Sequence, residues 1–279
     1  MPDETNTPPK KAPLSDIDLN RWREYEHIFT DSLWLFPNRA KGAGHQLDYH
    51  GNFIPQIATQ LFSRYTRAGD IVLDMFLGSG TSALEAINMG RRCVGVELKA
   101  ELVDYVRGKI PPDMLDTAVR VRQGNSNSDE IAPQIRADLQ AMGSSHAQFL
   151  VLHPPYDNII RFSDTPEDLS NASSTDAFLD GFEAVARRGF ELLEPGRFAA
   201  LVIGDKYARG ELVPLGFLCL ERMNRIGFKT KAIIVKDIQG NEKGKGRAAN
   251  LWRYRALAGG YYIFKHEYVM VMFKPARRA

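Results

Sequence analysis

The segment HPPY, residues 153–156, follows an apolar run and carries groups suited to chemistry on a planar nitrogen. Two consecutive prolines continue neither a helix nor a β-ladder, so they form a rigid, extended corner at the end of a strand. That corner would aim the Pro154 carbonyl and a nitrogen of His153 at one point, where they would accept the hydrogens of an amino group and free its lone pair. The candidate catalytic residues are His153, Pro154, Pro155 and Tyr156, of which the last would stack on the ring that carries the amino group.

His153 acts as an acceptor only while one of its ring nitrogens is unprotonated. We therefore predict that activity falls below about pH 6 to 6.5, as the imidazole takes up a second proton. An amino group that belongs to a paired base must also leave the duplex before it reaches such a corner. The rate would come from positioning and electrostatics, and no covalent intermediate is expected.

A second segment, DMFLGSGT at residues 74–81, has the order strand, glycine turn, helix. Glycines let the backbone approach a ligand closely and adopt positive φ. The turn differs from the GxGxxG of dinucleotide binders and from the GxxxxGKS/T phosphate loop, which argues against a ligand held by its phosphates. S-adenosylmethionine fits better, because Asp74 would meet its ammonium directly or through water and Glu97, at the next strand end, would take its ribose hydroxyls. The candidate cofactor-binding residues here are Asp74, Phe76, Gly78, Ser79, Gly80, Thr81, Glu97 and Asn125, with Phe76 packing on the adenosine and Asn125 contacting the adenine edge.

The segments that position these residues alternate between strand-like and helix-like patterns. Short apolar runs predict strands at 70–74, 93–98, 118–122, 148–152, 196–203, 231–236 and 266–273. Amphipathic spacing predicts helices at 53–65, 82–89, 99–109, 132–142, 174–193 and 215–226. This alternation predicts an α/β fold: a doubly wound, mostly parallel, seven-stranded Rossmann-like sheet with helices on both faces and its ligand site at the carboxyl ends of the strands.

Length alone leaves one or two domains open, and we expect a single soluble catalytic domain with loop insertions. The chain has 279 residues, of which 44% are hydrophobic, so it can bury one large core. Its net charge of +2 does not by itself indicate a nucleic-acid partner. No apolar run reaches the roughly 18 to 20 residues of a membrane span, and the first residues lack the apolar centre of a signal peptide, so we expect a cytoplasmic protein without a membrane partner. We predict a disordered tail at 1–14 and a single catalytic domain at 15–279.

Neither a disulfide nor a metal site is expected. The two cysteines, Cys93 and Cys219, lie in apolar segments without a CxxC or His/Cys spacing. His266 and Glu267 are adjacent in the last predicted strand, so they would point to opposite faces of the sheet and would not form a metal pair.

Four stretches resemble the DNA N4-cytosine/N6-adenine methyltransferase family: YHGNFIPQI at 49–57, GDIVLDMFLGSGTSALEA at 69–86, GRRCVGVEL at 90–98 and LHPPY at 152–156. The resemblance implies a class I, S-adenosylmethionine-dependent enzyme that methylates the exocyclic amino group of a flipped base in double-stranded DNA, as in restriction-modification systems. In this family an arm before the first strand folds over the cofactor, which assigns cofactor contacts to His50, Asn52 and Phe53. The family usually has Asp, Asn or Ser in place of His153, so adenine N6 and cytosine N4 both remain candidate targets.

Recognition of the target sequence is expected to rest on short loops. The family usually carries a sizeable target-recognition insertion, whereas the segments after the HPPY corner are modest: 157–176, 206–214 and 237–261. The last of these interleaves aromatic with basic residues, a pattern that suits stacking on unpaired bases and contacts to phosphate. The candidate DNA-binding residues are Lys243, Lys245, Arg247, Trp252, Arg253 and Arg255, with Tyr254 among them.

Other functions remain open at this stage. Related folds use a Pro-Pro-Tyr corner on other planar nitrogens, so an RNA or protein-glutamine amino-methyltransferase is an alternative. A catalytically inactive DNA-binding regulator that keeps the cofactor fold is a second one. A homodimer, a partner subunit that shares target recognition, or a companion restriction endonuclease would each be compatible with the short loops. All readings as an enzyme require the proline corner and the glycine turn to face one cavity.

Overall fold

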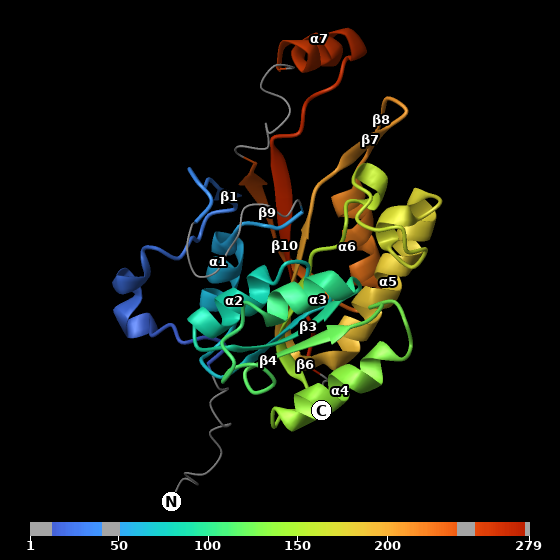
Figure 1. The fold of residues 1–279 in the computed structure, drawn as a ribbon. Coiled ribbons are helices and arrows are strands. Elements are labelled where there is room, and N and C mark those ends of the chain that lie inside the picture. Colours follow the sequence, from blue (N-terminus) through green and yellow to red (C-terminus); the bar gives the residue numbers. More distant parts are fainter. Residues whose placement is uncertain (1–12, 41–50, 239–248, 277–279) are drawn as a thin grey trace, which may run out of the picture.

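The fold is built on one large twisted sheet (Figure 1). The computed structural model describes residues 13–40, 51–238 and 249–276. Within them the strand order is β1-β9-β10-β6-β5-β2-β3-β4, and all neighbours pair in parallel except that β10 is antiparallel to both β6 and β9. The strands are β1 (Leu33–Trp34), β2 (Ile71–Asp74), β3 (Arg92–Glu97), β4 (Val119–Gln123), β5 (Ala147–Leu152), β6 (Leu193–Ile203), β9 (Lys229–Asp237) and β10 (His266–Phe273).

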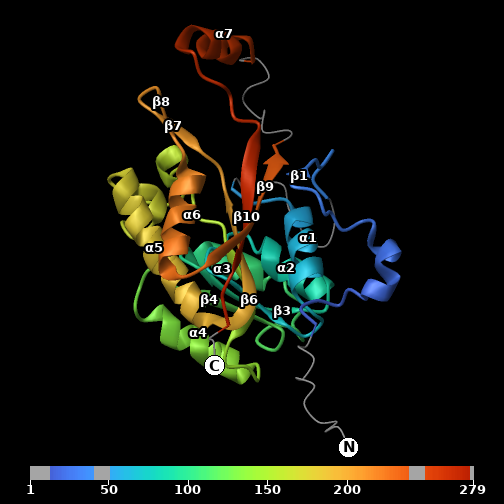
Figure 2. The same ribbon diagram turned by 180° about the vertical axis from the view of Figure 1, so that it is seen from behind.

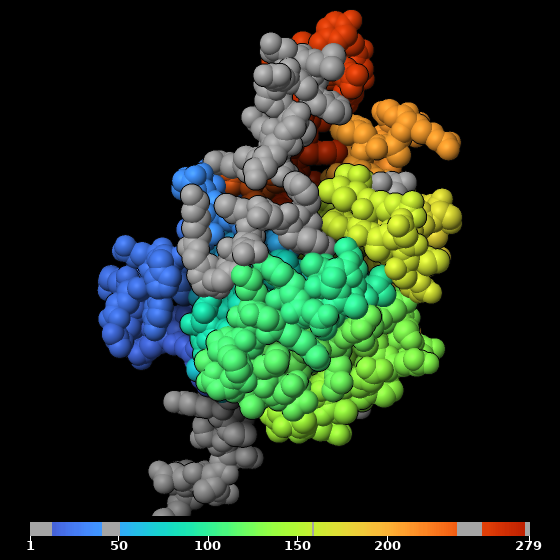
Figure 3. Space-filling view, viewed as in Figure 1, coloured from blue at the N-terminus to red at the C-terminus, as the bar shows by residue number. Residues whose placement is uncertain are grey.

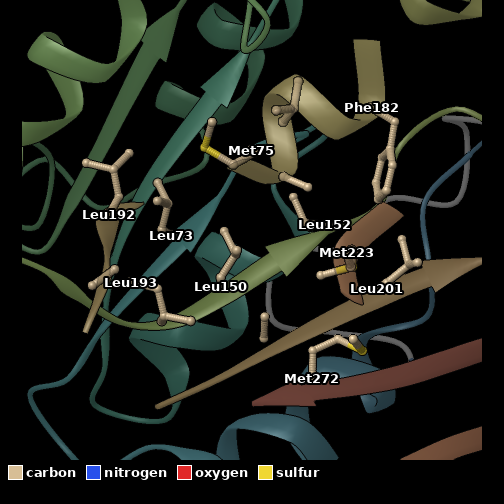
Figure 4. Packing of buried hydrophobic residues seen from close by; sticks show 14 of the residues in the cluster. Leu73, Met75, Leu150, Leu152, Phe182, Leu192, Leu193, Leu201, Met223 and Met272 are labelled. Atoms are coloured by element: carbon tan, nitrogen blue, oxygen red, sulfur yellow. The ribbon is translucent and has the colours of Figure 1, made fainter. Parts of the chain in front are cut away.

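Helices cover both faces of the sheet because successive strand residues point to opposite sides. Leu73 and Leu150 pack in the core beneath α4, α5 and α6 (Figure 4), whereas Val72 and Val151 pack in the core beneath α1, α2 and α3. The central strands β2 and β5 are thus buried on both faces, which explains their largely apolar sequences, whereas the edge strand β4 alternates buried with partly exposed residues. The helices are α1 (Pro55–Tyr65), α2 (Thr81–Asn88), α3 (Ala100–Arg107), α4 (Ile131–Ala141), α5 (Thr175–Leu192) and α6 (Leu215–Ile226).

The expected doubly wound α/β fold is confirmed, but the described part of the sheet has eight strands where the sequence predicts seven. The additional strand is β1, which precedes the first strand that the sequence predicts. It forms because Trp34 is buried, packing edge-on to Phe29 and Phe36 with ring centroids 6.2 and 6.0 Å apart. A two-residue strand has no periodicity, so its sequence could not predict it.

Two further elements occupy segments expected to be loops. Strands β7 (Lys206–Ala208) and β8 (Glu211–Val213) pair as a separate hairpin, and α7 (Ala249–Gly259) follows β9. Figures 2 and 3 show the hairpin and α7 projecting beyond the body of the molecule. Three short 3-10 segments complete the described elements: Leu19–Tyr25, Asp157–Ile159 and Leu169–Asn171. Within the described ranges, no helix combines the length and apolarity needed to span a membrane.

The strand order places the functional segments together. The chain runs outward in one direction through β2, β3 and β4 and then returns to the centre, where β5 pairs beside β2. Between β2 and β5 the order of the strands reverses, and such a switch point leaves a crevice outside the carboxyl ends of the strands. The glycine turn leaves β2 and the HPPY corner leaves β5 at this edge.

Gly80 gives a direct test of how the turn packs. It is the N-cap of α2 with φ +84°, and a Cβ atom there would lie 2.8 Å from Val106 Cγ1. We expect Gly80→Ala to lower the free energy of unfolding by about 2 to 4 kcal/mol, from backbone strain and overpacking together. Gly90 has a similar φ of +70° but no atom within 4 Å of an added Cβ, so Gly90→Ala should cost only about 1 kcal/mol. Equal losses in urea unfolding would show that contact with Val106 does not matter.

Candidate active site at the carboxyl edge of the sheet

A cavity with about 880 Å³ of empty space, part of it open to solvent, lies at the switch point. The glycine turn and the proline corner both line it, which is the arrangement that every reading as an enzyme requires. Of the candidate residues, the lining includes Asn52, Phe53, Phe76, Gly78, Thr81, Glu97, Asn125, His153, Pro154 and Pro155.

Glu97 organises the glycine turn from the end of β3. Its Oε2 accepts a hydrogen bond from the Gly78 N–H at 2.8 Å, and its Oε1 accepts one from the Lys99 N–H at 2.9 Å. Each carboxylate oxygen keeps a lone pair for a ligand hydroxyl. Burial raises the pKa of Glu97 to about 7, against the effect of the two backbone hydrogen bonds. A partly desolvated carboxylate beside an apolar cavity suits a ligand with two hydroxyls and a positive charge.

Asp74 holds the start of the turn from inside the protein. Its Oδ1 accepts from the Phe76 N–H at 2.9 Å and its Oδ2 accepts from the Ser82 hydroxyl. It is 1% exposed, and burial raises its pKa to about 6. Asp74, Ser79 and Gly80 are not part of the cavity lining. Contact between Asp74 and a ligand ammonium therefore stays a prediction, and the observed role of this carboxylate is to join β2 to α2.

Several of the residues expected to contact S-adenosylmethionine line this cavity. Gly78 is left-handed, with φ +55°, and carries no side chain that would fill the space above the turn. Phe76 and Leu77 supply apolar walls, and Asn125 adds an amide whose Oδ1 accepts from the Asn127 N–H at 2.8 Å. The NH₂ group of Asn125 is the part that would face an adenine acceptor.

His153 lies at the cavity with its imidazole held between two aromatic rings. The ring of Phe53 packs edge-on at a centroid distance of 5.2 Å, and that of Tyr156 does so at 5.8 Å. Burial lowers the pKa of His153 to about 4, with Lys236 adding to the shift and Glu267 opposing it. The imidazole is therefore neutral near pH 7, as an acceptor must be. With this lowered pKa we expect the loss of activity closer to pH 4 than to the pH 6 to 6.5 predicted for an ordinary histidine.

Tyr156 is tied into the fold behind the corner. Its hydroxyl donates to Glu267 Oε2 at 2.7 Å, and Glu267 Oε1 forms an ion pair with Lys236 at 3.0 Å. Burial, followed by the Glu267 charge, raises the pKa of Tyr156 well above its usual value. A Cβ at Gly204 would lie 3.0 Å from the tyrosine ring, so the ring packs closely on that glycine. Tyr156 is not part of the cavity lining, and its stacking on a base stays a prediction.

Asp157 fixes the chain just past the corner. It is 1% exposed and has φ +52°, a strained value for a residue other than glycine. Its Oδ2 pairs with Lys206 Nζ at 2.6 Å and accepts from the Thr175 hydroxyl at 2.9 Å. These contacts join the corner to the β7–β8 hairpin and to the start of α5.

The sequence did not predict that the segment after the HPPY corner lines the cavity. Phe162, Glu167, Asp168 and Leu169, from the segment after the corner, line the cavity together with Gly51 of the arm. A Cβ at Gly51 would lie 2.8 Å from the Phe162 ring, so the arm and this segment meet above the site. Only the position of the segment after a strand end could have indicated this. Among the described residues no cluster of three or more His, Cys, Asp and Glu could hold a metal ion.

The candidate DNA-binding residues lie away from the cavity where the structure describes them. Arg253, Tyr254 and Arg255 are exposed on α7. The chain after α7 contacts the hairpin, because the rings of Tyr261 and Phe264 lie 5.2 and 5.0 Å from the ring of Tyr207. His50, Lys243, Lys245, Arg247 and the side chain of Trp252 lie outside the described part of the structure.

Comparison with known proteins first defines the class. The strand order with antiparallel β10 and the helices on both faces are those of the class I methyltransferase fold. TrmN from Thermus thermophilus matches this chain with a TM-score of 0.51 at 18% identity, over 81% of this chain and 50% of that one. That likeness shows the fold.

More narrowly, part of the chain is similar to the N6/N4 DNA methylases. A family model described as DNA methylase matches residues 4–107, which include the arm, the glycine turn and Glu97. Type II methyltransferase M.MjaII of Methanocaldococcus jannaschii is 29% identical over 87 residues, covering 28% of this chain and 16% of the relative. Type II methyltransferase M.BglI of Bacillus subtilis is 32% identical over 89 residues, 31% of this chain and 24% of the relative. The match thus spans less than a third of the length of these relatives. The similarity to this family and the fold imply S-adenosylmethionine as the cofactor.

The raised pKa of Glu97 predicts how cofactor affinity depends on pH. A protonated carboxyl group loses its charge and one acceptor position, so binding should weaken as pH falls through about 7. We expect affinity for S-adenosylmethionine, measured by calorimetry, to drop about tenfold between pH 7.5 and 6. Glu97→Gln should bind more weakly at pH 7.5 but show a flat profile over this range. A wild-type profile as flat as that of the variant would remove Glu97 from the site.

Proposed function

We propose that this chain is a site-specific DNA methyltransferase that transfers a methyl group from S-adenosylmethionine to the exocyclic amino group of a flipped base, adenine N6 or cytosine N4. The observation that carries the proposal is that a glycine turn organised by Glu97 and a proline corner with neutral His153 line one cavity. The match of residues 4–107 to the DNA methylase model supports DNA as the substrate.

In this proposal the residues that bind the cofactor and those that bind the target base lie at two different ends of the cavity. At the β2 and β3 end, Glu97 would accept the ribose hydroxyls, and Phe76 would pack on the adenosine face. When bound, the cofactor supplies an electrophilic methyl group. At the β5 end, His153 and the Pro154 carbonyl would accept the two hydrogens of the base amino group, which moves its nitrogen toward tetrahedral geometry. Because His153 is neutral and desolvated, it does so without a prior change of protonation.

Burial around the corner supports this mechanism. Phe53, Phe162 and Leu169 add apolar side chains to the cavity lining, so a base that enters would displace water from this part of the cavity. A preorganised acceptor pair in such a space costs little reorganisation during the reaction. Pro155 adds rigidity, because two adjacent prolines fix the backbone that presents the Pro154 carbonyl.

Target recognition is proposed for the projecting part of the molecule. Helix α7 and the β7–β8 hairpin extend beyond the sheet (Figure 1), and Tyr254 and Tyr262 are 69% and 86% exposed there. Aromatic side chains between arginines suit stacking and phosphate contacts. We extend the proposal to double-stranded DNA as substrate, with a homodimer or a companion restriction endonuclease as partners that its restriction-type relatives suggest.

The test is incubation of the chain with methyl-labelled S-adenosylmethionine and, separately, double-stranded DNA, RNA and protein. Digestion of the DNA to nucleosides and mass measurement should reveal N6-methyladenine or N4-methylcytosine. Label in RNA or in protein glutamine would move the activity to the corresponding alternative class. DNA binding without transfer to any substrate would leave the inactive-regulator function instead.

Charge reversal on α7 tests the proposed DNA contact. Because Lys and Arg release counterions from DNA, Arg253→Glu with Arg255→Glu should weaken binding at least about tenfold and reduce the slope of log K against log salt by about 2. Binding is measured by fluorescence anisotropy over a salt series. Arg136→Glu with Arg225→Glu is the matched control, because it makes the same change of net charge at two exposed arginines, on α4 and α6. An unchanged slope in the α7 variant would place the DNA elsewhere.

A further inference from the structure

A buried ion pair lies directly behind the catalytic corner. Lys236 of β9 and Glu267 of β10 are cross-strand partners, their charged groups are 3.0 Å apart, and their side chains are 6% and 10% exposed. Burying two charges costs desolvation energy that the ion pair alone often fails to offset, and apolar residues of similar volume are frequently as stable. The pair is therefore a weak choice for stability, and its other contact indicates what it does.

That contact is the hydroxyl of Tyr156. A tyrosine hydroxyl has one proton, and here it is donated to Glu267 Oε2 at 2.7 Å. The Tyr156 oxygen is also 3.4 Å from Nε2 of His153. Because the hydroxyl proton is already used, this longer contact can form only with Nε2–H as the donor and the tyrosine oxygen as the acceptor. The neutral imidazole then carries its proton on Nε2, and Nδ1 is the acceptor nitrogen.

This chain of contacts sets the tautomer of His153 because the other groups around the imidazole offer it no side-chain hydrogen bond among the described residues. Phe53 packs edge-on against the ring and supplies no hydrogen-bonding group. Among the described residues, the hydrogen bonds and ion pairs of the structure join His153 to Tyr156 and no other side chain. The charges that face the imidazole are those of Glu267 and Lys236.

We propose that Lys236 and Glu267 are positioning residues that set the tautomer of His153 through Tyr156, so that Nδ1 accepts a hydrogen of the target amino group. Lys236 holds the Glu267 carboxylate, Glu267 takes the tyrosine proton, and the tyrosine oxygen receives Nε2–H. The role in methyl transfer rests on the proposed function, whereas the tautomer belongs to the protein itself.

Two double variants separate this role from a purely structural one. K236M/E267M removes both charges and the acceptor, so Tyr156 would donate to His153 Nε2 and move the imidazole proton to Nδ1. K236M/E267Q also removes both charges, but the glutamine carbonyl still accepts the tyrosine proton, so Nε2–H should persist. Neither variant leaves an unpaired buried charge, and thermal unfolding of both checks that the fold is kept.

The tautomer is read from ¹⁵N–¹H long-range NMR correlations of the ligand-free protein, with the His153 signals identified by their loss in His153→Asn. Wild type and K236M/E267Q should show protonated Nε2, and K236M/E267M should show protonated Nδ1. The same Nε2–H in all three would overturn the proposal, as would protonated Nδ1 in the wild type, which needs no variant to fold.

Activity supplies the second measurement. K236M/E267M should lose about 100-fold in kcat with cofactor affinity unchanged, while K236M/E267Q should stay within about fivefold of the wild type. Equal losses in both variants would assign the pair a structural role and overturn the proposal. If the wild type transfers no methyl group to DNA, the proposed function fails, but the NMR comparison still decides the tautomer.

Discussion

Replacing His153 by leucine is expected to lower kcat for methyl transfer by about 100-fold or more, with little change in affinity for S-adenosylmethionine. Leucine keeps an apolar side chain against Phe53 but removes one of the two acceptors that would withdraw hydrogens from the amino group. Because that interaction strengthens only as the nitrogen becomes tetrahedral, its loss should appear in kcat and not in cofactor binding. Single-turnover transfer to a DNA duplex and calorimetric titration of the cofactor measure the two quantities.

His153→Asn is the matched control for this prediction. Asparagine is one of the residues that the resembling family usually has at this position, and its carbonyl restores an acceptor without a titratable group. We expect it to recover at least about tenfold of the loss seen with leucine. The wild-type rate should stay level down to about pH 5, since the pKa of His153 is lowered to about 4, apart from the separate effect of Glu97 on cofactor affinity. A leucine variant as fast as the asparagine variant would exclude His153 as an acceptor.

The parts of the fold that the sequence predicts well are those in which local pattern and tertiary environment agree. The strands β2, β3 and β5 are short apolar runs buried on both faces, each followed directly by a polar or turn-forming group. The glycine turn, Glu97 and the HPPY corner lie close together because β5, β2 and β3 are neighbouring parallel strands that end at the same edge of the sheet. The residues that line the cavity floor follow from that topology.

The parts that sequence could not predict depend on contacts between distant residues. The hairpin β7–β8 and helix α7 are short, exposed elements with weak periodicity, and the hairpin is secured by the buried Asp157–Lys206 pair. The hydroxyl of Tyr156 meets a carboxylate 111 residues away in the chain. No spacing rule connects them.

The contacts of Glu267 could not be predicted from the sequence either. Its neighbour His266 suggested a metal pair, which the alternation of strand side chains argued against. In the structure His266 contacts the Tyr268 hydroxyl at 3.3 Å, while Glu267 contacts Tyr156. The alternation argued correctly that the two side chains point to opposite faces of the sheet. The partner of Glu267, however, is Tyr156, which follows β5 and is distant in the sequence.

Glu97→Ala is expected to lower affinity for S-adenosylmethionine by about 100-fold, because it removes acceptors for two ribose hydroxyls at about 1.5 kcal/mol each. It also leaves the N–H groups of Gly78 and Lys99 without their carboxylate, which loosens the turn itself. The Michaelis constant for the cofactor should rise in proportion, whereas kcat at saturating cofactor should change by less than about tenfold, since the acceptors of the amino group are untouched.

Glu101→Ala separates the effect of the Glu97 carboxylate from that of general negative charge nearby, because Glu101 lies in the first turn of α3. Glu101 is 69% exposed and pairs with Lys99 at 3.0 Å, so its loss removes one negative charge near the turn and leaves the carboxylate of Glu97 in place. Cofactor affinity of this variant should stay within about twofold of the wild type, because exposed ion pairs contribute little. If both alanine variants weakened binding equally, attraction by surface charge would account for the effect, and the ribose would have to be held by another part of the cavity. A loss confined to Glu97→Ala would exclude surface charge as the cause and assign the effect to the Glu97 carboxylate, through its contact with the ligand or through its hydrogen bonds to the turn.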